Sequence, residues 1–185
     1  MKNKVKKIAV IGPESTGKSA LCKALALHFD CLWCPEYARE YLLRNGKEYT
    51  FDTLQTIAKG QLRKEDDYMQ RSIDGNKSFL FIDTEMYIMK VWYEYAFNQC
   101  PYFVLQEIVN RPYDYYLLTN TDLPWEEDEL REYPDPASRE KLLHTYKDIL
   151  IHQTSGWQMV SGHGDERTQN AIAAIERIFL EKNDR

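Results

Sequence analysis

Short apolar segments alternate with longer segments of mixed apolar and polar residues along the chain. Five short apolar segments have the pattern of strands: 5–11, 31–34, 79–82, 115–118 and 157–160. Segment 79–82 contains no polar residue, which is typical of a parallel strand that is covered on both faces. These segments predict a sheet of five strands.

Between these segments, apolar residues recur at helical spacing, which predicts helices over residues 20–28, 36–44, 51–72, 86–97, 138–153 and 165–181. We expect Thr50 to cap the third helix, and Pro101 interrupts the pattern after the fourth. Strands that alternate with helices indicate an α/β fold, in which a parallel five-stranded sheet carries helices on both faces. We predict a single domain over residues 1–185.

Composition narrows the class of protein. The chain has 185 residues, 43% of them hydrophobic, and a net charge of -5. This charge gives no general attraction to nucleic acid, so we expect a neutral or cationic small molecule as the partner. Four lysines near the start precede an apolar run over residues 8–11 only, and no stretch approaches the length of a membrane span. We therefore expect a cytoplasmic protein without a membrane partner; the sequence makes no prediction about oligomeric state.

The four cysteines include a C-x-x-C pair, Cys31 and Cys34. Both lie in a predicted strand, where positions i and i+3 face opposite sides. Because no second Cys or His pair has the spacing of a tetrahedral zinc site, we predict buried structural thiols.

The first predicted strand is followed by a sequence that fits G-x-x-x-x-G-K-[ST] at every fixed position. The predicted nucleotide-binding residues are Gly12, Pro13, Glu14, Ser15, Thr16, Gly17, Lys18, Ser19 and Ala20. A strand, a glycine loop and a helix in that order form a P-loop, whose backbone N–H groups surround a phosphate. Lys18 would contact the β- and γ-phosphates of ATP, and Ser19 would bind Mg²⁺. A surface turn with a helix cap is the alternative, but it does not explain the Lys-Ser pair.

Other candidates follow the remaining strands. Because ligands of parallel sheets bind beyond the carboxyl ends of the strands, we expect the P-loop, Glu36, Asp83, Asp122 and Gly162 to share one rim. The loop over residues 162–164 lies where many P-loop kinases hold adenine, although glycine is common in any such loop.

Two carboxylates have the positions that phosphoryl transfer needs. Asp83 is placed to hold Mg²⁺, with a helix N-cap as the alternative or additional role. Glu36 can orient an acceptor hydroxyl and take its proton, or it can be a first-turn glutamate favoured by the helix dipole. Arg39, one turn later, can clamp a substrate oxygen or pair with a carboxylate.

The stretch 123–139 is charged, contains three prolines and has weak periodicity, so we interpret it as a short mobile lid. Arg131 and Arg139 in such a lid can close over phosphates and exclude water. The alternative is a solvated loop whose arginines balance its own carboxylates.

Four sequence blocks occur in a distinctive order: G-P-E-S-T-G-K-S, P-E-Y-A-R-E-Y, F-I-D-T-E and L-L-T-N-T-D-L-P-W-E-E-D-E-L-R. Together they resemble the ribosylnicotinamide kinase domain of NadR-type proteins, in the P-loop kinase superfamily. The resemblance covers nearly the whole chain. It implies transfer of the ATP γ-phosphate to the 5′-hydroxyl of nicotinamide riboside, which gives nicotinamide mononucleotide.

The resemblance also implies roles for single residues. Lys18, Glu36, Asp83 and Arg131 would be catalytic, with Arg131 on the lid near ATP and Ser19 with Asp83 at the metal. The substrate would contact Glu36, Tyr37, Arg39, Asp83 and Tyr87. Aromatic faces such as Tyr37, Tyr87 and Trp92 suit the positive pyridinium ring of the riboside.

This chain departs from the family pattern at Pro35, where the family has Trp, and at Glu129, where it has Gly. It contains no H-x-G-H motif, so we predict no adenylyltransferase activity. The alternatives are another P-loop nucleoside, nucleotide or metabolite kinase, or a non-catalytic module that binds ATP or a pyridine nucleotide. A GTPase is a weaker alternative, because residues 120–122 lack N-K-x-D spacing. The sequence does not separate ATP from GTP, nor Glu36 from Asp83 as the base.

Overall fold

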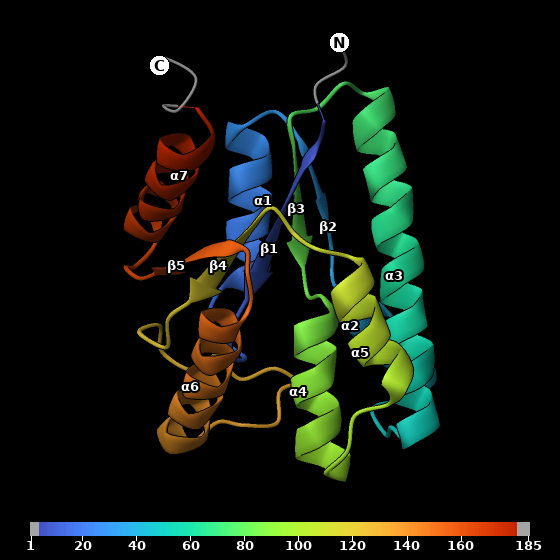
Figure 1. Ribbon diagram of the computed structural model, residues 1–185. Helices are drawn as coiled ribbons and strands as arrows, with labels where there is room; N and C mark the ends of the chain where they lie inside the picture. The colour runs from blue at the N-terminus through green and yellow to red at the C-terminus, as the bar shows by residue number, and fades with distance from the viewer. Residues whose placement is uncertain (1–3, 181–185) are drawn as a thin grey trace.

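A five-stranded parallel sheet forms the centre of the molecule. The computed structural model describes residues 4–180. The strands are β1 (Lys6–Ile11), β2 (Leu32–Cys34), β3 (Phe79–Asp83), β4 (Tyr115–Thr119) and β5 (Gly156–Val160). Their order across the sheet is β2-β3-β1-β4-β5, and every neighbouring pair is parallel (Figure 1). The predicted fold class is therefore confirmed.

Seven helices connect and cover the strands. They are α1 (Lys18–His28), α2 (Tyr37–Asn45), α3 (Phe51–Asp74), α4 (Met86–Phe97), α5 (Tyr102–Asn110), α6 (Pro136–His152) and α7 (Asp165–Phe179). The Thr50 hydroxyl accepts a hydrogen bond from Thr53 N, so the predicted cap of α3 is present. The last predicted helix was expected to end at Glu181, which lies outside the described residues.

Helices α1 and α3 extend two residues beyond the predicted ranges, and two further differences from the sequence prediction have a clear local cause. The pattern marked Pro101 only as an interruption, but a separate helix, α5, begins directly after it. Proline is well tolerated at a helix start, because its missing N–H has no partner there in any case. Helix α6 begins at Pro136, two residues earlier than predicted, because Asp135 caps it by accepting a hydrogen bond of 2.7 Å from Ser138 N.

Helices pack on both faces of the sheet. One face is covered by α1 and α7, whose apolar residues meet β-strand side chains such as Ile8, Phe81 and Leu117. The opposite face, which carries Ala9, Ile82 and Leu118 in the next register positions, is covered by α3, α4 and α6. This two-sided burial explains why β3 has no exposed position.

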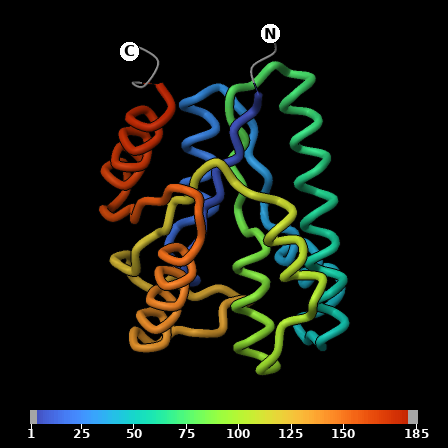
Figure 2. The backbone as a smooth tube through the Cα atoms, in the orientation of Figure 1, coloured from blue at the N-terminus to red at the C-terminus, as the bar shows by residue number. Residues whose placement is uncertain are grey.

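A third apolar cluster joins α2, α3, α4 and α5 beside the sheet. Here the Tyr37 ring lies against Gly60 of α3, where a Cβ atom would come within 2.0 Å of the ring. The path of the chain in Figure 2 shows that the segment between β4 and α6 runs to α4 before it returns to α6. The ring contact between Tyr95 and Tyr133, with 5.9 Å between centroids, agrees with that path.

The cysteines are all free thiols. Cys34 is buried, and Cys31 is half-buried. Burial raises the pKa of each of these two thiols to about 12. Within residues 4–180, no group of three or more His, Cys, Asp or Glu side chains is arranged to hold a metal ion. Over the same residues, no helix has the length and apolar character that a membrane crossing requires.

Candidate active site

The loop between β1 and α1 can form only with glycine at its first position. Gly12 has a φ of 145°, and a Cβ atom there would lie 2.3 Å from Thr119 Oγ1 and 2.8 Å from the Thr119 carbonyl oxygen. The Thr16 hydroxyl secures the loop from inside, since it donates to Pro13 O at 2.7 Å and lies 2.7 Å from the Thr119 hydroxyl. The end of β4 therefore supports the phosphate loop directly.

Lys18 and Ser19 stand at the start of α1, where the helix presents its free N–H groups. Lys18 Nζ turns back over the loop and donates to Gly12 O at 3.0 Å and Pro13 O at 2.8 Å. The Ser19 hydroxyl donates to Asp83 Oδ2 at 2.5 Å. The ammonium group thus lies over the loop that would hold a triphosphate.

Asp83 fits the role of a magnesium ligand. Its Oδ1 atom is buried and accepts no hydrogen bond from any described residue. An unpaired buried carboxylate oxygen is costly unless it binds a cation or water. A hard oxygen donor beside a serine hydroxyl and a phosphate loop is the donor set that Mg²⁺ takes in nucleotide sites.

The sequence left open whether Asp83 caps the following helix, and the structure shows that it does not. The N-cap of α4 is Glu85, whose carboxylate accepts hydrogen bonds from Tyr87 N at 2.9 Å and Ile88 N at 3.3 Å. Burial raises the pKa of Glu85 to about 8. Asp83 is therefore left free to face Ser19.

Glu36 lies in the N-cap position of α2, but its side chain makes no capping hydrogen bond. Its Oε1 atom instead accepts a hydrogen bond of 3.4 Å from the Thr84 hydroxyl. Loss of water around the carboxyl group, followed by the nearby Asp83 charge, raises the pKa of Glu36 to about 7. A carboxylate with such a pKa can exchange a proton near neutral pH.

The segment between β4 and α6 covers the phosphate loop. Glu14 Oε2 accepts hydrogen bonds from Glu132 N at 2.9 Å and Tyr133 N at 3.2 Å. Arg131 donates to the Ser15 hydroxyl at 3.3 Å, and Arg139 donates to Ser15 O at 3.1 Å. Both predicted lid arginines therefore lie at the loop, but Arg139 belongs to the first turn of α6, so the lid ends before residue 136 and not at residue 139 as predicted. No described carboxylate forms an ion pair with either of them.

The same segment, called the lid below and defined as residues 123–135, also contacts α2 and the chain after it. Arg39 donates to both carboxylate oxygens of Asp128. Lys47 pairs with Glu129 at 3.3 Å, and the Tyr49 hydroxyl donates to Glu132 at 3.0 Å. The Arg39 guanidinium holds the pKa of Asp128 at about 2. Of the two roles open to Arg39, pairing with a carboxylate is the one observed.

A cavity of about 690 Å³ lies between the phosphate loop, α2, α4, α6 and the lid. Its walls include all nine residues Gly12 to Ala20, together with Glu36, Ala38, Arg39, Leu42, Lys47, Thr84, Ile88, Val91, Trp92, Tyr95, Leu123, Pro124, Glu126, Asp128, Glu129, Leu130, Arg131, Glu132, Tyr133, Leu142 and Tyr146. The loop and the candidate base thus line one cavity.

Three predicted substrate residues, Tyr37, Asp83 and Tyr87, are not part of this wall. Asp83 lies beside Ser19, which is part of it. Tyr37 packs over Gly60, and the Tyr87 ring packs against the Tyr116 ring with 5.8 Å between centroids. Their roles stay predictions. The aromatic wall of the cavity comes instead from Trp92, Tyr95, Tyr133 and Tyr146. The sequence carries a signal for part of this wall, because residues 88, 91, 92 and 95 have the i, i+3, i+4, i+7 spacing of one helix face.

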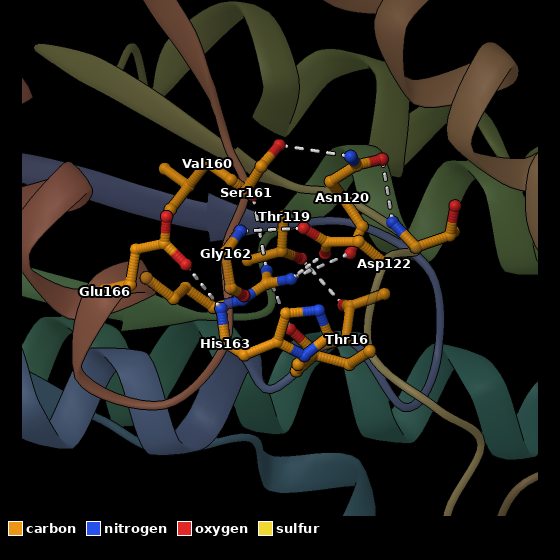
Figure 3. Close-up of polar contacts among 12 residues, drawn as sticks. Thr16, Thr119, Asn120, Asp122, Val160, Ser161, Gly162, His163 and Glu166 are labelled. Atoms are coloured by element: carbon orange, nitrogen blue, oxygen red, sulfur yellow. Dashed lines mark hydrogen bonds and ion pairs between the residues drawn. The ribbon is translucent and has the colours of Figure 1, made fainter.

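A second polar cluster joins the ends of β4 and β5 to the phosphate loop. Figure 3 shows Asp122 and Gly162 side by side, and Gly162 N donates to Asp122 Oδ2 at 2.7 Å. Arg167 of α7 pairs with Asp122 and donates to Thr16 O at 3.3 Å and Gly162 O at 2.9 Å. The predicted rim is therefore continuous, and the sequence carried no signal for Arg167 beyond its place in a helix.

Comparisons with known proteins agree with this arrangement. The model of a family described as AAA domain matches residues 7–167. The trifunctional NAD biosynthesis/regulator protein NadR of Escherichia coli (strain K12) is 26% identical over 151 residues, which are 79% of this chain and 36% of that protein. The chain thus spans about a third of the length of that relative.

The solved structures that share the fold include two of NadR and one of a thymidylate kinase. A NadR protein in complex with NR has a TM-score of 0.74 and 21% identity, over 94% of this chain and 50% of that one. A NadR protein in complex with NAD and AMP-PNP has a TM-score of 0.72 and 21% identity, over 94% and 49%. Thymidylate kinase from Ehrlichia chaffeensis has a TM-score of 0.66 and 11% identity, over 92% and 98%.

Proposed function

The chain belongs to the AAA domain family, and from that premise we propose that it is a small-molecule kinase that transfers the γ-phosphate of ATP to the 5′-hydroxyl of nicotinamide riboside. The product would be nicotinamide mononucleotide. We also propose that the protein takes part in NAD salvage and that it is cytoplasmic.

One observation carries the proposal. A single cavity of about 690 Å³ joins the whole phosphate loop to the Glu36 carboxylate and to an aromatic wall. Cavities of roughly 300–1,000 Å³ are the usual size for small-molecule ligands. The space therefore suits a nucleoside next to a triphosphate, which is the geometry of direct phosphoryl transfer.

The residues that line the cavity, together with Asp83 beside Ser19, have separate tasks in this reaction. The loop N–H groups, Lys18 and Arg131 stabilise negative charge on the transferred phosphoryl group. Ser19 and Asp83 would hold Mg²⁺, which supplies charge neutralisation between the β- and γ-phosphates when bound. The acceptor oxygen bonds to the γ-phosphorus, its proton passes to Glu36, and the bond to the β–γ bridging oxygen breaks to release ADP.

The charge of the cavity supports a cationic acceptor. Two cations of the wall, Lys18 and Arg131, lie at the phosphate loop, where a triphosphate would face them. The other two, Arg39 and Lys47, are already paired with Asp128 and Glu129. Glu36 and Glu132, also in the wall, have no ion-pair partner among residues 4–180. An unpaired carboxylate and an aromatic wall together attract a planar cation such as the pyridinium of nicotinamide riboside.

The likeness to NadR supports the same acceptor, since one of the similar structures is a NadR protein in complex with NR. The likeness to AMP-PNP-bound NadR supports ATP as the donor. The similarity to thymidylate kinase extends over 98% of that enzyme. A nucleotide as the acceptor is therefore the alternative to nicotinamide riboside. A non-catalytic nucleotide-binding module is the second rival.

The test is direct detection of the product by mass spectrometry. The protein is incubated with ATP, Mg²⁺ and a panel of acceptors that contains nicotinamide riboside, common nucleosides and thymidylate. We expect a phosphorylated product from nicotinamide riboside, and none from the Lys18→Ala variant. If only thymidylate or another acceptor gave a phosphorylated product, that acceptor would replace nicotinamide riboside as the proposed substrate. Thermal stabilisation by ATP without any product would favour the non-catalytic module.

A further inference from the structure

Thr84 has a backbone conformation that its side chain disfavours. Its φ is 76°, and it is 1% exposed. The other non-glycine residues of positive φ within residues 4–180 are Ser15, Asp30, Asn76 and Asn98. Asp and Asn tolerate this region and Ser15 belongs to the phosphate loop, whereas a β-branched residue there is a genuine outlier. A residue held in such a conformation at a site invites a functional explanation.

The cause of the strain lies in the two neighbouring residues. Asp83 ends β3 with its carboxylate on the Ser19 hydroxyl. Glu85 turns its carboxylate onto the first N–H groups of α4. The chain must satisfy both anchors across one residue, which forces Thr84 into the left-handed region. Glycine or asparagine would meet the same demand with less strain.

What threonine adds is its hydroxyl group. Thr84 Oγ1 donates to Glu36 Oε1 at 3.4 Å, and both residues line the cavity. In the part of the chain that the structure describes, no other side chain makes a hydrogen bond to Glu36. Glu36 Oε2 therefore has no partner there. One oxygen lies within reach of the Thr84 hydroxyl, and the second is left for the acceptor.

We propose that Thr84 is a positioning residue, whose hydroxyl aims the Glu36 carboxylate at the acceptor and whose strained backbone is retained for that purpose. The inference rests on the proposed kinase function. It makes Thr84 act through Glu36 and not on the substrate itself. A small displacement of a general base is enough to slow proton transfer, because the reacting atoms must lie at near hydrogen-bond distance.

The first test removes the hydroxyl while it keeps the shape of the side chain. Thr84→Val should lower kcat about tenfold or more and leave KM for ATP within about twofold. Thr84→Ser restores the hydroxyl and should keep kcat within about threefold of the parent. The matched control is Thr56→Val in α3, whose hydroxyl bonds only to Asp52 O. This control should leave both constants unchanged.

The second test asks whether Thr84 acts through Glu36. In a Glu36→Gln background, Thr84→Val should cause little further loss of kcat, because the group that it positions is already gone. Multiplied losses in the double variant would overturn the positioning role. So would a Thr84→Val enzyme that turns over like the parent, or a Thr84→Ser enzyme as slow as Thr84→Val.

The third measurement does not depend on turnover. Thr84→Gly relieves the strained φ, so its thermal midpoint should be no lower than that of Thr84→Ser. A thermal midpoint for Thr84→Gly several degrees below that of Thr84→Ser would contradict the inference that the backbone of Thr84 is strained. If the parent protein phosphorylates no acceptor of the panel, the proposed function fails, and the role of Thr84 fails with it. Activity in the parent with equal activity in Thr84→Val overturns the role of Thr84 alone.

Discussion

Arg39 and Asp128, which are 89 positions apart, form a two-pronged ion pair with N–O distances of 3.0 and 2.7 Å. Arg39 lies one turn after the candidate base on α2, and Asp128 lies in the lid. The pair therefore joins the acceptor side of the cavity to the segment that covers the phosphate loop. The arginine side chain is 47% exposed, so the pair contributes little to stability and its main effect is on the position of the lid.

Removal of this pair should weaken acceptor binding. We expect Arg39→Gln to raise KM for the acceptor about fivefold, because the lid loses its link to α2. The thermal midpoint should fall by less than about 3 °C, because exposed ion pairs contribute at most about 1 kcal/mol. The matched control is Arg44→Gln, which breaks an exposed pair with Glu40 on the same helix. Equal kinetic effects in both variants would contradict the link.

Gly12 should tolerate no side chain. In Gly12→Ala the new methyl group meets Thr119, and the φ of 145° strains any L-residue. We expect a loss of about 2 kcal/mol or more in the free energy of unfolding, together with loss of ATP-dependent thermal stabilisation. The measurement is denaturant unfolding with and without nucleotide. Gly75→Ala, at a φ of -79° and with its nearest contact at 3.2 Å from the Arg71 carbonyl oxygen, is the control and should lose clearly less stability than Gly12→Ala. A Gly12→Ala protein that still binds ATP would show that the loop can adapt.

The pKa of Glu36 predicts the acid limb of the activity profile. Because the pKa is raised to about 7, the carboxyl group is protonated below that pH and cannot accept the acceptor proton. We expect kcat/KM to fall about tenfold per pH unit below about pH 7 and to reach a plateau above it. The apparent value belongs to Glu36 and Asp83 together, since their charges interact. A profile that stays flat down to about pH 5 would exclude Glu36 as the base.

Glu85 predicts a pH dependence of stability with a definite sign. Its folded pKa of about 8 lies above the ordinary value of 4.5. The folded state therefore holds the proton more tightly than the unfolded state does. The contribution to stability is present at low pH and declines as the pH rises towards about 8.

The variant Glu85→Gln removes this titration. We expect the free energy of unfolding of the parent to drop between about pH 5.5 and about pH 8.5 by on the order of 1 kcal/mol or more relative to the variant. Denaturant unfolding at both pH values measures the difference. Glu48→Gln, an exposed glutamate outside the apolar clusters, is the control. Equal pH slopes in the parent and Glu85→Gln would contradict the raised pKa.

Sequence reasoning succeeded where neighbouring residues determine the structure. The phosphate loop could be predicted because its glycines, Lys18 and Ser19 are consecutive and act through local geometry. The strand ends placed Glu36 and Asp83 at the same rim, since parallel strands of one sheet share a carboxyl edge. The start of α5 was missed because nine residues after a proline carry too little pattern to separate a helix from an interruption.

The remaining details depend on contacts between distant parts of the chain. The left-handed φ of Thr84 follows from anchors on α1 and α4, and no local pattern records it. The aromatic candidates Tyr37 and Tyr87 face Gly60 and Tyr116, because packing of α2 on α3 and of α4 on the sheet decides which rings enter the cavity. The contacts of Arg167 with Thr16 and Asp122 could not be predicted for the same reason.

The hydrogen bond of Arg167 to the phosphate loop can form only after α7 has been synthesised. The phosphate loop is synthesised before α7, and the guanidinium that braces its Thr16 carbonyl belongs to a residue 151 positions later. The same guanidinium also ties down the ends of β4 and β5. In a growing chain the Thr16 carbonyl therefore lacks this hydrogen bond until α7 has docked, so the phosphate loop gains its last support only when the domain is complete.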